Sequence, residues 1–306
     1  MPKADKIWMD GKLVDWDKAQ VHILTHTLHY GLGVFEGIRC YEGEDGKSAI
    51  FRLKDHIKRL YNSADILSMK IPFEGKILFD ACKEIMKVNK LKHGYIRPIA
   101  FTGDGEMGLY ALSNPIRVSI AAWPWGTYLG DDGIKNGIRA KVSSYTRHQE
   151  KLILSKSKAV SSYTNSILAK REVLSAGYEE AIMLDPKGNV LEATGENIFI
   201  VSKGVVKTAP LDSSILEGIT RESIITILKD ENIPVKEELF RIEDVYAADE
   251  VFLTGTAAEI TPIREVDDKA IGTGKPGPIT KQVQQIYFDT VKGKNEKYKD
   301  WLDYLS

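Results

Sequence analysis

Hydrophobic and polar positions in the first third of the chain alternate between the spacings of strands and of helices. In "KIWMDGKLVDW", apolar residues flank Asp10-Gly11, a pair that favours a tight turn, and this predicts a β-hairpin. Apolar residues three or four positions apart predict helices in "KDHIKRLYNSADIL" and "GKILFDACKEIMKVNKL". Short apolar runs predict strands in "GVFEGIRCYEG", "SAIFRL", "GYIRPIAFTG" and "IRVSIAAWPW".

The glycine-rich, charged stretch after Trp125, "GTYLGDDGIKNG", is the best linker candidate. We expect a small N-terminal domain at 1–124, a linker at 125–136 and a larger domain at 137–306. In the larger domain the pattern predicts strands in "IRAKVSSY" and "EVFLTGT", ribbons in "EAIMLDPKGNVLEATGENIFIV" and "VSKGVVKTAP", and helices in "NSILAKREVLSAGY", "RESIITILKDEN" and from about Thr280. Because most strands come as hairpins rather than βαβ units, the predicted fold class is α+β.

Composition narrows the classes of partner. Of the 306 residues, 43% are hydrophobic and 28% charged, and the net charge is -1, which argues against nucleic acid or an anionic membrane as the main partner. Cys40 and Cys82 stand far apart and form neither a disulfide framework nor a zinc motif. With no signal-peptide pattern and no apolar run long enough to span a bilayer, we expect a cytoplasmic protein.

The segment "LILSKSKAVSSYTNSILAK" places Lys156 and Lys158 among serines and alanines, ahead of Tyr163. A lysine amine becomes a nucleophile when partial desolvation or a nearby cation lowers its pKa. Two solvated surface lysines would give the same pattern, so this segment alone leaves both interpretations open.

A glutamate lies inside an apolar strand in "NVLEATGENIFIV". Alternation puts Val190, Glu192 and Thr194 on one face, and a carboxylate on a half-buried strand needs a cationic partner. A pyridinium nitrogen would be one such partner, and a strand facing water is the alternative.

Two segments are suited to a phosphate group. "LEGITRES" leads into a helix, so the amides of Ile219 and Thr220 would lie at its positive end. "TGTAAEI" ends a strand in a turn where Thr256 offers a hydroxyl and an amide. Arg59 on "KDHIKRLYNSA" could add charge, or it could be an ordinary exposed helical arginine.

Two further patterns favour structural roles. His22, His26 and His29 have helical spacing, but "VHILTHTLHYG" offers no carboxylate or cysteine beside them, so structural histidines are favoured over a metal site. In "GTGKPGP", Pro276 replaces the Ser or Thr that a phosphate loop would use for magnesium, which favours a simple turn.

Taken together, these residues resemble the fold-type IV pyridoxal-phosphate enzymes, and specifically the branched-chain amino-acid aminotransferases. The resemblance runs from "IWMDGKLVDW" almost to the C-terminus, through "HYGLGVFEGIRCY", "YIRP", "WPWGTYLG", "EATGENIF", "LEGITRESI" and "EVFLTGTAAEITPI" in the family's order. It implies a two-domain D-amino-acid aminotransferase-like fold with the cofactor, pyridoxal 5'-phosphate (PLP), at the domain interface.

The resemblance also implies roles for the cofactor-binding residues. Lys158, rather than Lys156, would be the Schiff-base lysine, because Tyr163 stands where the family has a tyrosine that bonds the cofactor's phenolic oxygen. Glu192 matches the carboxylate that keeps the pyridine nitrogen protonated, which strengthens the ring as an electron sink. Leu216 matches a side chain packed on the ring. The groups that match the phosphate site are Arg59, the amides of Ile219 and Thr220, and Thr256.

On the substrate side, Tyr95 and the Thr256-Ala257 turn match groups that hold the α-carboxylate, and Arg97 matches the residue that receives glutamate's distal carboxylate. The apolar pocket is matched by Phe35, Gly37, Trp125, Tyr128 and Tyr163, with Tyr30 at its edge and Arg39 supporting the tyrosines. Leu109 lies on the loop "GDGEMGLYALSNP", which in the family can reach a neighbouring subunit's site, so a homodimer or higher homo-oligomer is expected.

The implied activity is ping-pong transfer of an amino group between leucine, isoleucine or valine and 2-oxoglutarate. The sequence departs from the family in "KAVSSY", which is bulkier than the usual glycine-rich version, and in Glu217, where proline is frequent. A D-amino-acid or (R)-amine transaminase, or an aminodeoxychorismate lyase, is the nearer alternative. A non-catalytic phosphate-ligand binding protein is the remote one.

Overall fold

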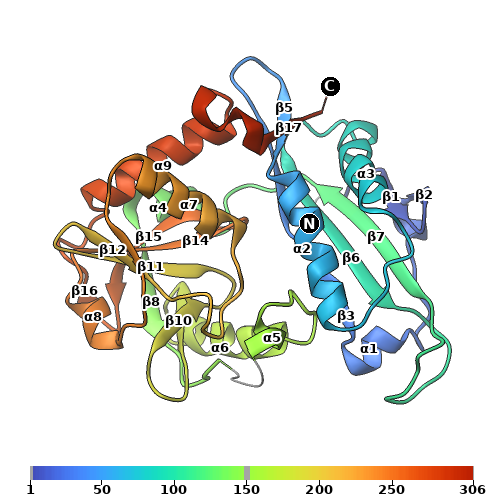
Figure 1. The fold of residues 1–306 in the computed structure, drawn as a ribbon, viewed down its shortest axis with the longest axis horizontal. Coiled ribbons are helices and arrows are strands. Elements are labelled where there is room, and N and C mark those ends of the chain that lie inside the picture. The colour runs from blue at the N-terminus through green and yellow to red at the C-terminus, as the bar shows by residue number, and fades with distance from the viewer. Residues whose placement is uncertain (1–2, 148–151, 306) are drawn as a thin grey trace. The chain divides into compact units, whose positions relative to one another are not determined.

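The secondary structure is divided between two units of the chain (Figure 1). The computed structural model describes residues 3–147 and 152–305. The first unit consists of Met1–Gly126, Ser157–Ser162 and Asp289–Ser306, and the second of Thr127–Lys156 and Tyr163–Phe288.

These units cut the chain at other places than the predicted domain boundaries. Residues 157–162 belong to the first unit because their backbone pairs with it: Phe35 N donates to Lys158 O (3.1 Å) and Val160 N to Gly33 O (2.8 Å). Asp289–Ser306 belongs there because it contains a strand paired with the first unit's sheet. The predicted linker contains a helix, α4 (Asp131–Asn136). Independent folding of the predicted domains stays a prediction.

The first unit is built on an eight-stranded sheet in the order β17-β5-β4-β6-β7-β1-β2, with β3 also paired to β6. Its strands are β1 (Lys6–Met9), β2 (Lys12–Asp15), β3 (Gly33–Phe35), β4 (Ile38–Glu42), β5 (Ser48–Phe51), β6 (Gly94–Thr102), β7 (Ile116–Trp123) and β17 (Leu302–Tyr304). The predicted hairpin is confirmed: β1 and β2 are joined at Asp10 and Gly11, whose φ angles are 48° and 87°.

Two amphipathic helices, α2 (Leu53–Ile66) and α3 (Gly75–Val88), pack on this sheet and confirm the predicted periodicity. Leu53 and Leu60 of α2 and Ile85 of α3 are fully buried in the same core. Burying each such side chain contributes roughly 1.5–3 kcal/mol. The shorter helices are α1 (His26–Tyr30), η1 (Trp16–Lys18) and η2 (Glu296–Trp301), and Figure 1 shows β17 beside β5 at the chain's end.

The second unit is built on a nine-stranded sheet in the order β10-β9-β8-β15-β14-β11-β12-β13. A further pairing of β10 with β11 closes six of these strands into a ring, and β16 pairs with β15. The strands are β8 (Ile138–Val142), β9 (Glu180–Leu184), β10 (Val190–Ala193), β11 (Asn197–Ser202), β12 (Val205–Thr208), β13 (Val235–Glu237), β14 (Glu250–Gly255), β15 (Glu259–Val266) and β16 (Lys269–Ala270).

Helices and aromatic stacking complete the second unit. Phe199 and Phe252 stack inside the sheet with ring centroids 5.0 Å apart. The helices are α4, α5 (Leu152–Ser155), α6 (Tyr163–Ser175), α7 (Ile219–Asp230), α8 (Ile242–Tyr246) and α9 (Pro278–Val291). None of the helices in the described part of the chain has the length and apolar character needed to cross a bilayer.

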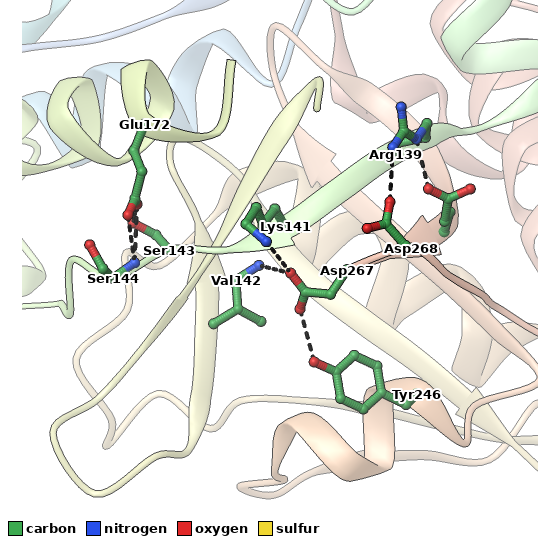
Figure 2. A network of polar contacts seen from close by, with 10 residues as sticks. Arg139, Lys141, Val142, Ser143, Ser144, Glu172, Tyr246, Asp267 and Asp268 are labelled. Atoms are coloured by element: carbon green, nitrogen blue, oxygen red, sulfur yellow. Dashed lines mark hydrogen bonds and ion pairs between the residues drawn. The ribbon is translucent and has the colours of Figure 1, made fainter. Parts of the chain in front are cut away.

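A polar network fastens the β15–β16 turn to β8 (Figure 2). Asp267 accepts from Lys141 Nζ (3.3 Å), Val142 N (3.2 Å) and Tyr246 Oη (2.8 Å). Asp268 accepts from Arg139 Nη2 (3.2 Å). Both aspartates have positive φ, a strained conformation that this turn requires and the network supports.

Candidate active site

The backbone of Lys158 is held firmly in the first unit. Lys158 N donates to the hydroxyl of Ser63, and the hydroxyl of Ser157 donates to the Ser63 carbonyl, each at 3.0 Å. Because Ser63 is fully buried on α2, these bonds and the pairing with β3 fix the lysine between two elements.

The two lysines have different surroundings. Lys158 is half-buried, and its Nζ lies 5.2 Å from the centroid of the Phe35 ring. Lys156 Nζ instead pairs with Glu217 Oε1 at 3.2 Å, and both of these side chains reach solvent. Lys156 therefore has an ordinary surface ion pair.

Arg59 belongs to a buried charge cluster that the sequence did not reveal. Its Nε donates to Glu36 Oε1 (2.6 Å) and its Nη2 to Glu36 Oε2 (2.9 Å), and His56 Nδ1 lies 2.7 Å from the same Oε2. Burial alone would raise the pKa of Glu36, but Arg59 and His56 outweigh it and hold that pKa well below its usual range. The cluster orients the guanidinium and leaves open whether it meets a phosphate.

Arg97 lies in an aromatic cage on β6. Its guanidinium carbon is 4.8 Å from the centroid of Phe35, 5.2 Å from that of Tyr95 and 6.0 Å from that of Trp123. Its Nη2 donates to Tyr95 Oη at 3.4 Å, whereas its buried Nε has no hydrogen-bond partner among the described residues. A buried donor without a partner is costly, so this guanidinium is poised to bind an anion.

Glycine is required at position 37. A Cβ there would lie 1.9 Å from Tyr95 Oη, so any other residue would displace the tyrosine. Tyr95 also packs edge-on against Trp125, with centroids 4.6 Å apart. Arg39 holds this corner by donating from Nη2 to Gly126 O (2.6 Å) and to Trp125 O (3.3 Å). Phe35, Gly37, Arg39, Tyr95, Arg97 and Trp125 thus form one contiguous group.

Glu192 is buried in the second unit, so the alternative of a water-facing strand is wrong. Its cationic partner is Arg147, which the sequence did not single out. Arg147 Nε donates to Glu192 Oε1 at 2.8 Å, and Nη2 makes a second contact with the same oxygen. The other oxygen accepts longer bonds from Asn197 Nδ2 (3.2 Å) and Leu216 N (3.3 Å).

The N-terminus of α7 lies beside this carboxylate along the chain. Asn197 Nδ2 also donates to Leu216 O (3.1 Å), which ties the segment before α7 to β11. A Cβ on Gly218 would lie 2.0 Å from Asn197 Oδ1, so only glycine fits at the N-cap. No side chain caps the helix, and Ile219 and Thr220 are buried there, as expected for amides that serve an anion.

Thr256 and Ala257 form the turn between β14 and β15. The hairpin of Gly195 and Glu196 packs against this turn, because a Cβ on Gly255 would lie 3.3 Å from Glu196 Cγ. Burial, followed by the charge of Glu180, raises the pKa of Glu196 to about 8.

Tyr163 is the first residue of α6. Lys170 Nζ on this helix lies 5.4 Å from the ring centroid of Tyr128 and donates to Glu180 Oε2 at 2.5 Å. Two other predicted residues lie at exposed positions of the first unit: 41% of Tyr30 and 91% of Leu109 are accessible to solvent.

The three histidines make separate contacts with the backbone. His26 Nε2 lies 2.8 Å from Gly108 O and His29 Nε2 lies 2.9 Å from Ile23 O, while His22 Nδ1 accepts from Leu24 N. Within residues 3–147 and 152–305 no group of three acidic, histidine or cysteine side chains could hold a metal ion.

The chain matches a known family and well-characterised relatives. The model of the family "Amino-transferase class IV" matches residues 33–266. A branched-chain-amino-acid aminotransferase from Pseudomonas aeruginosa is 46% identical over 304 residues, which are 98% of each chain. The crystal structure of the Escherichia coli branched-chain amino acid aminotransferase superposes with a TM-score of 0.97 at 43% identity, covering 99% of this chain and 100% of that one.

A third relative, a branched-chain amino acid aminotransferase from the source abbreviated "T.th.", has been solved with cofactor-like ligands. Its structure with pyridoxamine 5'-phosphate has a TM-score of 0.96 at 44% identity, and its complex with N-(5'-phosphopyridoxyl)-L-glutamate has a TM-score of 0.94 at 42% identity. Both comparisons cover all of both chains.

Proposed function

Because the chain belongs to the class IV aminotransferases and, within them, to the branched-chain-amino-acid aminotransferases, we propose that the residues described above are its PLP and substrate sites. The enzyme depends on PLP and transfers the amino group of branched-chain amino acids. Leucine, isoleucine and valine as donors and 2-oxoglutarate as acceptor are the proposed substrates.

The donors of the second unit fit PLP. The buried carboxylate of Glu192 suits a protonated pyridine nitrogen, the uncapped amides of Ile219 and Thr220 and the turn at Thr256 suit a phosphate, and Leu216 offers an aliphatic surface. Tyr163 would bond the phenolic oxygen, and Arg59 of the first unit would add charge at the phosphate. When bound, PLP supplies a carbonyl carbon that takes up the amino group and a ring that withdraws electrons from the substrate's Cα.

Lys158 is the proposed covalent attachment point and proton carrier. Its fixed backbone limits the arc that Nζ can sweep, which favours repeated transfer of a proton to and from the substrate's Cα. Lys156 is excluded from this role in the proposal, since its amine is engaged by Glu217.

The observation that carries the substrate assignment is the unpartnered, buried Nε of Arg97 inside an aromatic cage. Glutamate would bring a distal carboxylate to this guanidinium, and charge-assisted bonds of that kind are strong. Leucine would bring only apolar atoms, which pack against the rings of Phe35, Tyr95 and Trp125. One pocket can therefore accept both classes of side chain.

The test is glutamate formation by the purified, PLP-loaded enzyme from a panel of L- and D-amino acids with 2-oxoglutarate. Activity with L-leucine, L-isoleucine and L-valine, and none with their D-forms, is the expected result. Preference for D-amino acids or (R)-amines would transfer the enzyme to the alternative transaminase groups, and pyruvate release from aminodeoxychorismate would identify a lyase.

A homodimer or higher homo-oligomer is also proposed, because the first unit exposes an extended apolar surface. It comprises Val21, Ile23, Leu24, Leu28, Tyr30, Met107, Leu109, Tyr110 and Leu112. The bond from His26 to Gly108 O ties its two segments together. Large exposed apolar surfaces mark association sites. Leu109→Asp should therefore lower the mass in solution, and a wild-type monomer at micromolar concentration would contradict the proposal.

The proposed location is the cytoplasm. The two cysteines, Cys40 and Cys82, are buried free thiols, as is usual in a reducing compartment. Cell fractionation with an antibody against the chain tests this, and recovery from an extracellular fraction would contradict it.

A further inference from the structure

Arg147 joins three elements of the second unit through one guanidinium. Nε and Nη2 contact Oε1 of Glu192 on β10, while Nη1 donates to the hydroxyl of Ser166 on α6 at 3.2 Å. Only 18% of the arginine side chain and 4% of the glutamate side chain are exposed, so this ion pair is largely shielded from water.

The segment that carries Arg147 is also fastened to the first turn of α6. Asn165 Nδ2 donates to Thr146 O at 2.8 Å, next to the contact of Arg147 with Ser166. Both contacts fall within three residues of Tyr163, the first residue of the helix. Arg147 therefore sets the position of Glu192 relative to the turn that begins with Tyr163.

The two oxygens of Glu192 are held unequally. Oε1 accepts two donors from a charged guanidinium, whereas Oε2 accepts only the longer, neutral contacts from Asn197 and Leu216. Since a carboxylate offers about four acceptor positions, the weaker contacts on Oε2 are the ones that a new donor could most easily replace.

We propose that Arg147 is a positioning residue for the cofactor ring, which fixes Glu192 and keeps its carboxylate available to the ring nitrogen. The inference rests on the proposed roles of Glu192 and Tyr163. A guanidinium in contact with a carboxylate favours the ionised carboxylate, and it acts less on a ring nitrogen that lies beyond it. The proton shared between ring and carboxylate thus stays on the ring.

The test compares PLP-loaded Arg147→Gln, Arg147→Lys and wild-type enzyme. Arg147→Gln should shift the pH dependence of the bound cofactor's visible absorption, and should slow the leucine half-reaction by about ten- to a hundredfold, as loss of a charge-assisted contact does. Arg147→Lys should recover part of both, because it keeps the charge and loses the paired geometry.

Arg139→Gln is the matched control. Arg139 is in the same unit, on β8, and it also bonds acidic side chains: Glu265 at 2.7 Å and Asp268 at 3.2 Å (Figure 2). This control should leave the absorption and the half-reaction within about twofold of wild type, since exposed pairs contribute little. Thermal unfolding of each variant shows whether Arg147→Gln remains folded.

Glu192→Gln separates failure of this inference from failure of the proposed site. If Glu192→Gln alters the cofactor's absorption and Arg147→Gln does not, Arg147 has no positioning role. If neither variant alters it, the proposed role of Glu192 is wrong. If Arg147→Gln slows the reaction as much in the Glu192→Gln background as in wild type, the arginine acts independently of Glu192 and the inference is overturned.

Discussion

Lys156 Nζ lies 3.2 Å from Glu217 Oε1, in an ion pair that both residues make at the surface of the second unit. The position of Glu217, where relatives frequently have proline, thus supplies a carboxylate for the lysine that is not the proposed nucleophile. Lys158, two residues further on, has its backbone fixed by Ser63 and its amine beside the Phe35 ring.

The first prediction separates these two lysines. Borohydride reduction of the PLP-loaded enzyme should attach the cofactor irreversibly to the peptide "SKSKAVSSY" at Lys158, as peptide mass spectrometry can establish. Lys158→Ala should abolish transamination. Lys156→Ala, the matched control, should keep most of it, because an exposed pair contributes only about 0–1 kcal/mol. Label at Lys156 would overturn the assignment.

The second prediction concerns Glu192. Glu192→Gln should retain PLP, because the phosphate groups remain, yet slow the chemical step severely, because an amide stabilises a protonated ring nitrogen far less than a carboxylate does. Equilibrium dialysis measures retention and single-turnover absorbance measures the step. Near-normal turnover would leave Glu192 a structural role only.

Long periodic segments were predictable because their own pattern determines their burial. The helices α2, α3 and α7 each place a continuous apolar face in a core, and this face is visible in the sequence. Strand β15 was not predicted, since Pro262 and the charged pair Arg264-Glu265 interrupt its apolar run. It forms because β14 and β8 pair with it from both sides, which no local pattern reveals.

The same limit applies to the candidate site. The residues in named motifs, such as Glu192 and Lys158, could be found from sequence because their spacing is local. Their partners could not: Arg147 is 45 positions from Glu192, and Glu36 is 23 positions from Arg59. Only the fold brings such charges together, and a buried carboxylate signals only that some cation must be near.

The third prediction is a pH dependence of stability at Glu196. Burial, and then Glu180, raises the pKa of Glu196 from 4.5 to about 8. The folded state therefore favours the protonated acid, and its contribution to stability is complete below about pH 4.5 and is lost as the pH rises to about 8. Glu196→Gln keeps a neutral side chain and should escape this loss.

Urea unfolding at pH 5 and pH 9 provides the measurement. The free energy of unfolding of Glu196→Gln relative to wild type should be higher at pH 9 than at pH 5 by at least about 1 kcal/mol, since one pKa unit corresponds to about 1.4 kcal/mol. Glu172→Gln is the control, because hydrogen bonds from Ser143 and Ser144 outweigh burial and lower the pKa of Glu172. Its effect should stay constant over this range. A constant effect for Glu196→Gln as well would contradict the prediction.

The last prediction concerns the recognition of two substrates by Arg97. Arg97→Ala should slow the glutamate and 2-oxoglutarate half-reaction by about ten- to a hundredfold in kcat/KM, because a charge-assisted contact contributes about 1.5–3 kcal/mol. Leucine has no distal charge and should change only a few-fold. Single-turnover spectra of the two half-reactions make the comparison within one preparation. Arg117→Ala is the control on the neighbouring strand β7, where the arginine pairs with Asp10 at 2.7 Å instead of lying unpaired in an aromatic cage. It should affect both half-reactions alike, whereas equal losses for leucine and glutamate in Arg97→Ala would remove Arg97 from its proposed role.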